Sequence, residues 1–263
     1  MDTQIKRGAL PHTYIKVERG AAETVQGGVI EETYLTIRAN GYTVASMMCS
    51  PVDEEALALG FLYNEAIITS MDDVKSIDVD AECVNVFLHR RNIHLKRQMI
   101  MTSGCGAGVT FHQANASRYK VETDFTTTPD VVLSRMQDLK SAARLYNEVR
   151  GVHTALLGSA DVALYSAEDV GRHNTVDKIA GKVVRDGVDP RNCLLITSGR
   201  ISSEMISKAH RLNIPIVASR TAPTSTAVEL ADAWEICLVG YVRRDSMRVY
   251  THPFRLGLGA AEL

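Results

Sequence analysis

The sequence predicts an α/β protein: a mainly parallel sheet with helices on both faces, preceded by a smaller strand-rich α+β unit. Two observations indicate this architecture. The C-terminal part alternates short apolar strands with helical patterns, whereas roughly the first hundred residues are dominated by strand patterns. The length of 263 residues suits one large domain or two modest ones. We place a small N-terminal domain at residues 1–115 and the larger α/β domain at 116–263.

In the N-terminal unit, a turn signal at Asn40-Gly41 joins two loosely alternating strands. A helix opens at 50–53, because Pro51 suits a first helical turn and the acidic run at 53–55 suits the positive end of a helix dipole. An apolar stripe at helical spacing continues that helix, comprising Leu57, Ala58, Phe61 and Leu62. The expected strands cover 12–18, 31–39, 42–48, 74–79 and 84–89.

The larger domain begins with a long helical pattern over 129–147, with one apolar side formed by Val132, Met136, Leu139, Ala143 and Tyr146. Strands and helices alternate after it, which is the pattern of a sheet covered on both faces. The expected strands cover 153–157, 162–166, 193–197, 216–219, 235–241 and 247–250, and the expected helices cover 174–185, 202–212 and 223–233.

Composition and charge exclude several classes of function. Hydrophobic residues make up 45% of the chain, and 29 basic against 31 acidic side chains give a net charge of −2. A chain so close to neutral lacks the general positive field that binds nucleic acid. No apolar run reaches the roughly 20 residues of a membrane helix, and residues 1–14 contain no apolar signal core. We therefore expect a cytoplasmic protein that uses neither nucleic acid nor membrane.

The five cysteines are scattered and odd in number, and none has the spacing of a metal ligand pair. A disulfide framework and a structural zinc site are therefore not expected. Four of them lie in apolar segments and are interpreted as small buried hydrophobic residues: Cys49, Cys83, Cys193 and Cys237.

Cys105 differs, because it stands among glycines in the segment TSGCGAG at 102–108. Glycines let backbone N–H groups turn toward the sulfur, and such donors stabilise the reactive thiolate. The alternative is a tight glycine turn that contains a cysteine incidentally. Two histidines are candidate bases for Cys105, His112 and His153, although a histidine at the start of a strand more often has a structural role.

Three strand-to-helix turns of similar composition lie at 168–174, 197–202 and 219–225. Each brings Arg and small polar side chains to the point where a strand ends, and such turns meet at one edge of a parallel sheet. Free N–H groups at helix starts, with Arg nearby, favour a phosphate-bearing ligand. The alternative is that the hydroxyls are helix caps and the arginines surface residues. The candidate ligand contacts in the first two turns are Arg172, His173, Ser198 and Arg200.

A further polar segment joins the last two strands at 240–246. Taken alone it resembles a solvated hairpin tip, but an aromatic ring beside cations and a hydroxyl is also suited to stack a base and hold a phosphate. The candidate contacts here are Tyr241, Val242, Arg243, Arg244, Asp245 and Ser246.

Several long motifs resemble the formate dehydrogenase accessory sulfurtransferases, the FdhD family. They cover most of the chain from about residue 30 onward. The matching segments are TSGCG (102–106), EDVGRHNTVDK (168–178), TSGRISSEM (197–205), SRTAPTSTAVELA (219–231) and VYTHP (249–253).

The resemblance implies a cytoplasmic sulfurtransferase. Such a protein takes persulfide sulfur from a cysteine desulfurase. It passes the sulfur to the bis-molybdopterin guanine dinucleotide cofactor, with molybdenum or tungsten, of apo formate dehydrogenase. It also implies a cytidine-deaminase-like, three-layer C-terminal domain and homodimers. By the same resemblance, Cys105 carries the persulfide and residues 241–246 bind the dinucleotide cofactor, which is a bound substrate.

Two departures from the related patterns matter. Gly108 stands where many family members carry the second cysteine of C-x-x-C, so the mechanism must rely on one persulfide on Cys105. His153-Thr154-Ala155 lacks the glutamate of the deaminase motif H-x-E, and no P-C-x-x-C follows, so deamination is not expected. Two alternative functions remain at this point, a chaperone that only binds and delivers the dinucleotide and a nucleotide-metabolising enzyme without zinc.

Overall fold

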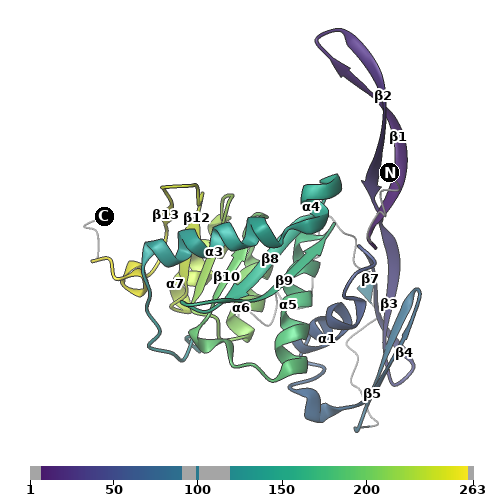
Figure 1. The fold of residues 1–263 in the computed structure, drawn as a ribbon. Coiled ribbons are helices and arrows are strands. Elements are labelled where there is room, and N and C mark those ends of the chain that lie inside the picture. Colours follow the sequence, from purple (N-terminus) through teal and green to yellow (C-terminus); the bar gives the residue numbers. More distant parts are fainter. Residues whose placement is uncertain (1–6, 91–98, 101–118, 260–263) are drawn as a thin grey trace.

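The computed structural model describes residues 7–90, 99–100 and 119–259. Its larger part is a six-stranded sheet between two helical layers (Figure 1). In spatial order the strands are β13 (Arg248–Val249), β12 (Cys237–Gly240), β11 (Ile216–Ser219), β10 (Leu194–Thr197), β8 (His153–Gly158) and β9 (Ala163–Asp169). Within the described part of the chain, no helix is long and apolar enough to cross a membrane.

The sheet is mixed, so the prediction of a mainly parallel sheet is wrong. The only parallel pairs in it are β10 with β11 and β11 with β12. β8 is antiparallel to both β10 and β9, and β13 is antiparallel to β12. The physical reason is loop length: β8 and β9 are separated only by residues 159–162, which suffice for a hairpin but not for the crossover that parallel strands need.

Helices cover both faces of this sheet, as the alternation of elements predicts. Leu195 of β10 packs in the cluster shared with three helices, whereas its neighbours Leu194 and Ile196 pack in the cluster shared with α3 on the opposite face. The first layer consists of α5 (Arg172–Asp186), α6 (Ser203–Arg211) and α7 (Ser225–Ala233), and the second is α3 (Pro129–Ala142).

The single helix predicted over 129–147 is in fact two. The chain bends at Ala143 (φ −74°, ψ 71°), where α3 ends and α4 (Arg144–Val149) begins. The buried carboxylate of Glu168 accepts hydrogen bonds from the backbone N–H groups of Leu145 (2.8 Å) and Tyr146 (2.9 Å). A carboxylate that binds the free N–H groups of a first turn stabilises a new helix start, which explains the break.

The N-terminal unit contains a second, five-stranded sheet packed against one helix, α1 (Glu54–Asn64). The Asn40-Gly41 turn is confirmed, since both residues have the positive φ values (50° and 82°) of a tight hairpin turn. In spatial order the strands are β5 (Val74–Asp80), β6 (Cys83–Leu88), β3 (Thr33–Ala39), β4 (Tyr42–Cys49) and β7 (Met99–Ile100). Three short 3-10 helices complete the elements, η1 (Met71–Asp73), η2 (Pro190–Asn192) and η3 (Pro253–Leu256).

A separate hairpin of β1 (Ala9–Glu18) and β2 (Ala21–Ile30) extends away from the body (Figure 1). Most of β1 is predicted from the sequence, but β2 is not, because β2 contains a Gly27-Gly28 pair and no regular apolar alternation. The turn at Arg19-Gly20 again has two positive φ values (51° and 86°).

Helices α1 and α5 join the two parts of the molecule by direct contact of their backbones. An ideal Cβ atom on Gly60 would lie 1.7 Å from the carbonyl oxygen of Asp177, and one on Gly181 would lie 1.9 Å from that of Ala56. No side chain fits there, so both positions require glycine. Figure 1 shows α1 between the N-terminal sheet and α5. The predicted domain boundary at residue 115 lies outside the described residues.

Candidate functional site

The three polar turns identified in the sequence meet at one edge of the six-stranded sheet. Strands β9, β10, β11 and β12 end at this edge, and β8, which runs antiparallel to β10, begins there. Backbone hydrogen bonds connect the segments across the edge. The N–H of Ser198 donates to Thr154 O (2.9 Å), that of Arg220 to Thr197 O (3.2 Å) and that of Tyr241 to Thr221 O (3.0 Å). Helices α5, α6 and α7 therefore also start along this edge.

Ser198 and His153 lie together at the centre of the edge. The Ser198 hydroxyl accepts a hydrogen bond from the N–H of Thr154 (2.9 Å) and lies 3.5 Å from His153 Nδ1. Burial lowers the pKa of His153, and the positive charge of Arg172 lowers it further. The imidazole is therefore neutral at pH 7. Gly199 packs closely beside it, because a Cβ there would lie 3.1 Å from Arg172 Cβ and 3.2 Å from His153 Nδ1.

His173 is also neutral, but it lies between helices α5 and α6. Its Nε2 atom is 3.2 Å from the hydroxyl of Ser202 and 3.4 Å from the carboxylate of Glu204. Burial, followed by the positive charge of Lys208, lowers the pKa of His173 to about 3. Its described polar contacts are thus made between helices, and the structure gives it a packing role beside the edge.

A cavity of about 580 Å³ opens between this edge and the bend that joins α3 to α4. Its volume is in the range of small-molecule sites. The lining residues from the sheet edge are Val152, His153, Thr154, Ser198, Arg220, Thr221 and Arg243. Those from the helical side are Leu139, Lys140, Ala143, Tyr146, Asn147 and Arg150.

The lining carries four cationic side chains, Lys140, Arg150, Arg220 and Arg243, and no carboxylate. Among the described residues, none of the four forms an ion pair. Four unneutralised positive charges around one cavity attract anions strongly, because field lines concentrate in a low-dielectric cleft. The arrangement is suited to a ligand with several negative charges, such as a phosphate ester.

The segment at 241–246 is partly structural. Val242 is 1% exposed in the core beneath the sheet, and its N–H donates to Ser219 O (3.0 Å), so its side chain is not available to a ligand. Tyr241 has a left-handed φ of 51°, and the guanidinium of Arg248 lies 4.2 Å from the centre of its ring. The Arg243 N–H donates to Ser246 O (2.8 Å), which closes the turn.

Two of the ten cofactor-binding residues predicted from the sequence line the cavity, Ser198 and Arg243. Arg244, Asp245 and Ser246 are exposed at the turn tip and do not line it. The remaining residues of the prediction that do not line it are Arg172, His173, Arg200, Tyr241 and Val242.

The helical wall of the cavity was missed from the sequence. Lys140 and Tyr146 belong to the segment 129–147, which the sequence predicts as one continuous helix with Tyr146 on its core side, and Arg150 lies beyond that segment. The bend at Ala143 changes the direction of the chain between Lys140 in α3 and Tyr146 in α4. The available signal was Gly151, directly after Arg150.

Cys105 and His112 lie outside the described residues. The structure does describe the other cysteines. Burial raises the pKa of Cys49 to about 12, that of Cys193 to about 11 and that of Cys237 to about 12. Thiols with such pKa values hold almost no thiolate at pH 7 and are poor nucleophiles. The predicted burial is confirmed for these three, whereas Cys83 is only half-buried.

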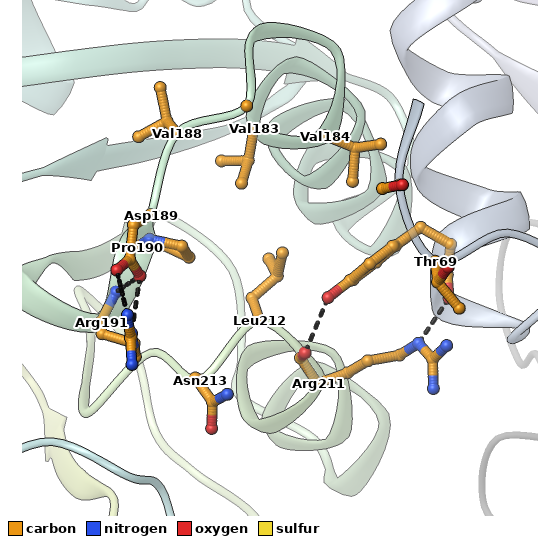
Figure 2. A pocket seen from close by; sticks show the side chains of 13 residues that line it. Thr69, Val183, Val184, Val188, Asp189, Pro190, Arg191, Arg211, Leu212 and Asn213 are labelled. Atoms are coloured by element: carbon orange, nitrogen blue, oxygen red, sulfur yellow. Dashed lines mark hydrogen bonds and ion pairs between the residues drawn. The ribbon is translucent and has the colours of Figure 1, made fainter. Parts of the chain in front are cut away.

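A second pocket, of about 390 Å³, lies at the opposite edge of the sheet, where α5 and α6 end (Figure 2). Its cations already have partners. Arg191 pairs with Asp189 (2.7 Å), and the guanidinium of Arg211 donates to Tyr63 O and lies 5.0 Å from the centre of the Tyr63 ring. Because its lining includes the carboxylate of Asp189 and only two cations, this pocket is a weaker candidate for an anionic ligand.

Comparison with known proteins decides the family. The model of the FdhD/NarQ family matches residues 30–257. The chain belongs to the FdhD/NarQ family. The chain is also similar to proteins named sulfur carrier protein FdhD. The relative from Wolinella succinogenes is 34% identical over 89% of this chain and 84% of its own length. The relative from Bacillus subtilis (strain 168) is 32% identical over 92% of this chain and 95% of its own length.

The fold of this FdhD/NarQ family member also matches a solved structure. The crystal structure of a protein from Desulfotalea psychrophila, assigned as a formate dehydrogenase accessory protein, superposes with a TM-score of 0.79. The match covers 94% of this chain and 99% of the other, at 24% identity. At that identity the comparison establishes a shared fold, including the mixed α/β arrangement of several sheets.

Proposed function

We propose that this FdhD/NarQ family protein is a sulfur carrier that acts as a sulfurtransferase in formate dehydrogenase maturation. In this proposal Cys105 receives a persulfide sulfur from a cysteine desulfurase. The protein then hands the sulfur to the bis-molybdopterin guanine dinucleotide cofactor, a bound substrate, before or during its insertion into the apoenzyme. The proposed setting is the cytoplasm, and the proposed assembly is a homodimer.

One observation carries the proposal: four cationic side chains without ion-pair partners in the described part of the chain surround a cavity that has no lining carboxylate. The proposed substrate carries two diphosphate groups, so its charge complements that cavity. The cavity lies at the sheet edge that carries the TSGR and SRTAP turns, which follow β10 and β11. Relatives at 32–34% identity over most of the chain are named sulfur carrier proteins, which supports the sulfur-transfer part.

The chemistry requires a single reactive thiol. The Cys105 thiolate attacks the outer sulfur of the desulfurase persulfide, the old S–S bond breaks, and the desulfurase cysteine leaves as a thiolate. On delivery, the electron pair of the new S–S bond returns to Cys105. The accepting metal centre supplies two electrons and binds the sulfur as sulfide, a soft ligand suited to it. Burial raises the pKa values of Cys49, Cys193 and Cys237, which makes these three poor nucleophiles, and the glycine-rich surroundings of Cys105 favour it over the half-buried Cys83.

Deamination is not part of the proposal. The cytidine-deaminase-like description of the larger domain stays a prediction. The sequence His153-Thr154-Ala155 has no glutamate to act as general acid and base.

The test is mass spectrometry after incubation with a cysteine desulfurase and cysteine. We expect one added sulfur atom on the wild-type protein and none on Cys105→Ala. Cys83→Ala, which removes the half-buried cysteine, is the matched control and should gain sulfur like the wild type. We also expect Cys105→Ala to bind GDP normally and to fail in activating formate dehydrogenase. Normal activation by Cys105→Ala would instead support a chaperone that only delivers the dinucleotide.

A further inference from the structure

Arg150 has a backbone conformation that is unfavourable for arginine. Its φ is 64° and its ψ is −162°, a region that is open to glycine and strained for residues with a Cβ atom. The following residue, Gly151, also has a positive φ of 75°. Glycine at position 150 would make this turn without strain. The chain therefore keeps an arginine here at a cost in backbone strain.

The contacts that Arg150 makes inside the protein do not account for this strain. Its guanidinium carbon lies 4.8 Å from the centre of the Tyr146 ring, and its N–H donates to Tyr146 O (3.1 Å). The backbone bond would remain with any residue that has an N–H. The side chain is exposed, and among the described residues it has no carboxylate partner. What remains is its place on the wall of the cavity.

Across that cavity lie the other cations of the lining. Lys140 comes from α3, Arg220 follows β11 and Arg243 follows β12, so the four charges are brought together from separate parts of the chain. Like charges repel one another when the cavity is empty, and an anion removes that repulsion. A diphosphate offers several charged oxygens to different partners at once, and the fork of an arginine is suited to bind two of them.

We propose that Arg150 is a specificity-determining residue that binds the diphosphate of a nucleoside diphosphate group, and that the strained turn holds its guanidinium over the cavity. This inference rests on the proposed function in one respect: the nucleoside diphosphate group is taken to be part of the guanine dinucleotide substrate. The guanidinium of Arg150 lies over the Tyr146 ring, and a contact with the face of a ring leaves the N–H groups free for phosphate oxygens.

The test combines affinity and stability for the full chain. GDP and GMP binding are measured by calorimetry, and the melting temperature is measured without ligand. For Arg150→Gly we expect GDP affinity to fall about tenfold and GMP affinity to fall less. The melting temperature should rise, because the strain is gone. Arg150→Lys keeps the positive charge but loses the two-pronged guanidinium, so its GDP affinity should lie between those of the wild type and Arg150→Gly.

Ala66→Gly is the matched control, because Ala66 has a similar φ of 59°, is exposed and lies away from the cavity lining. It should raise the melting temperature and leave GDP affinity unchanged. Unchanged GDP affinity in Arg150→Gly, a lowered melting temperature in that variant, or no GDP binding by the wild type would overturn the inference. Sulfur loading of Cys105 is measured separately, so the sulfurtransferase proposal can stand if this one fails.

Discussion

Lys178 and Asp169 form an ion pair inside the protein, with 2.6 Å between Nζ and Oδ2 and both side chains fully buried. The ammonium also donates to the carbonyl oxygens of Ser50 (3.2 Å) and Glu168 (3.0 Å). The carboxylate accepts from the N–H groups of Ser50 (3.1 Å) and Gly171 (2.7 Å). Since Ser50 follows β4 and Gly171 precedes α5, the pair connects the N-terminal unit to the edge that carries the site.

Removing one member of this pair should destabilise the protein strongly. Lys178→Met leaves the Asp169 carboxylate buried without its cation, a change that typically lowers the free energy of unfolding by about 3–5 kcal/mol. Urea denaturation measures the difference. Arg191→Met is the control, because its pair with Asp189 is more than half exposed and such pairs contribute only about 0–1 kcal/mol. Equal losses in the two variants would contradict the assigned role of the buried pair.

The contact between α1 and α5 should tolerate no added methyl group. Gly60→Ala places a Cβ within 1.7 Å of a backbone oxygen, so the helices must separate. We expect the free energy of unfolding to fall by about 3 kcal/mol or more, the upper range for overpacking. Gly259→Ala, which meets nothing within 4 Å, should change it by less than about 0.5 kcal/mol. A Gly60→Ala protein as stable as this control would show that the helices are not in contact.

His173 should make the protein less stable in mild acid. Its pKa is about 3 in the folded protein against an ordinary value of 6.5, so below pH 6.5 the unfolded chain binds a proton that the folded protein does not. Stability is therefore lost as the pH falls, by about 1–2 kcal/mol between about pH 7 and pH 5.

The comparison variant is His173→Gln, which has no titrating group at this position. Burial raises the pKa of the neighbouring Glu204, and protonation of that carboxyl acts in the opposite direction. The charged or titrating groups that lower the pKa of His173 are Lys208, Arg172 and His153. Because all of these remain in the variant, the stability difference between wild type and His173→Gln isolates the imidazole. A difference that does not change with pH would refute the assignment.

The two adjacent arginines of the 241–246 turn should have unequal effects on ligand binding. Arg243 lines the cavity, whereas Arg244 is exposed beyond it. We expect Arg243→Gln to weaken GDP binding roughly tenfold, because a charge-assisted contact is lost. Arg244→Gln removes the same charge one residue away and should have little effect. Titration calorimetry at one salt concentration distinguishes the two, and a larger loss in Arg244→Gln would place the ligand outside the cavity.

Most elements of the fold follow from local patterns in the sequence. The strand at 216–219 and the helix start near 203 are found within one residue, because apolar spacing and polar helix starts are local signals. The helix expected to include Pro51 in its first turn begins only at Glu54, because Asp53 has a left-handed φ of 57°. The order of strands in the sheet is not local. The short loop after β8 indicates its antiparallel pairing with β9, but the pairing of β10 with β8 depends on where the chain returns after α5.

The candidate site shows the same division. Its sheet-edge half was predictable, because the turns near Ser198 and Arg220 come at strand ends, and such ends share an edge. Its helical half was not. The bend at Ala143 depends on the carboxylate of Glu168, a residue far along the chain that binds the N–H groups of Leu145 and Tyr146. Only a tertiary contact distinguishes this bend from a continuous helix.

The glycine contact between α1 and α5 has a further consequence for the whole molecule. The two backbones meet with no side chain between them, so neither helix can keep this packing when the other melts. The N-terminal sheet and the larger sheet are therefore coupled energetically, and heating should produce one cooperative transition. Although the sequence suggests two domains, we expect the chain to unfold as one cooperative unit.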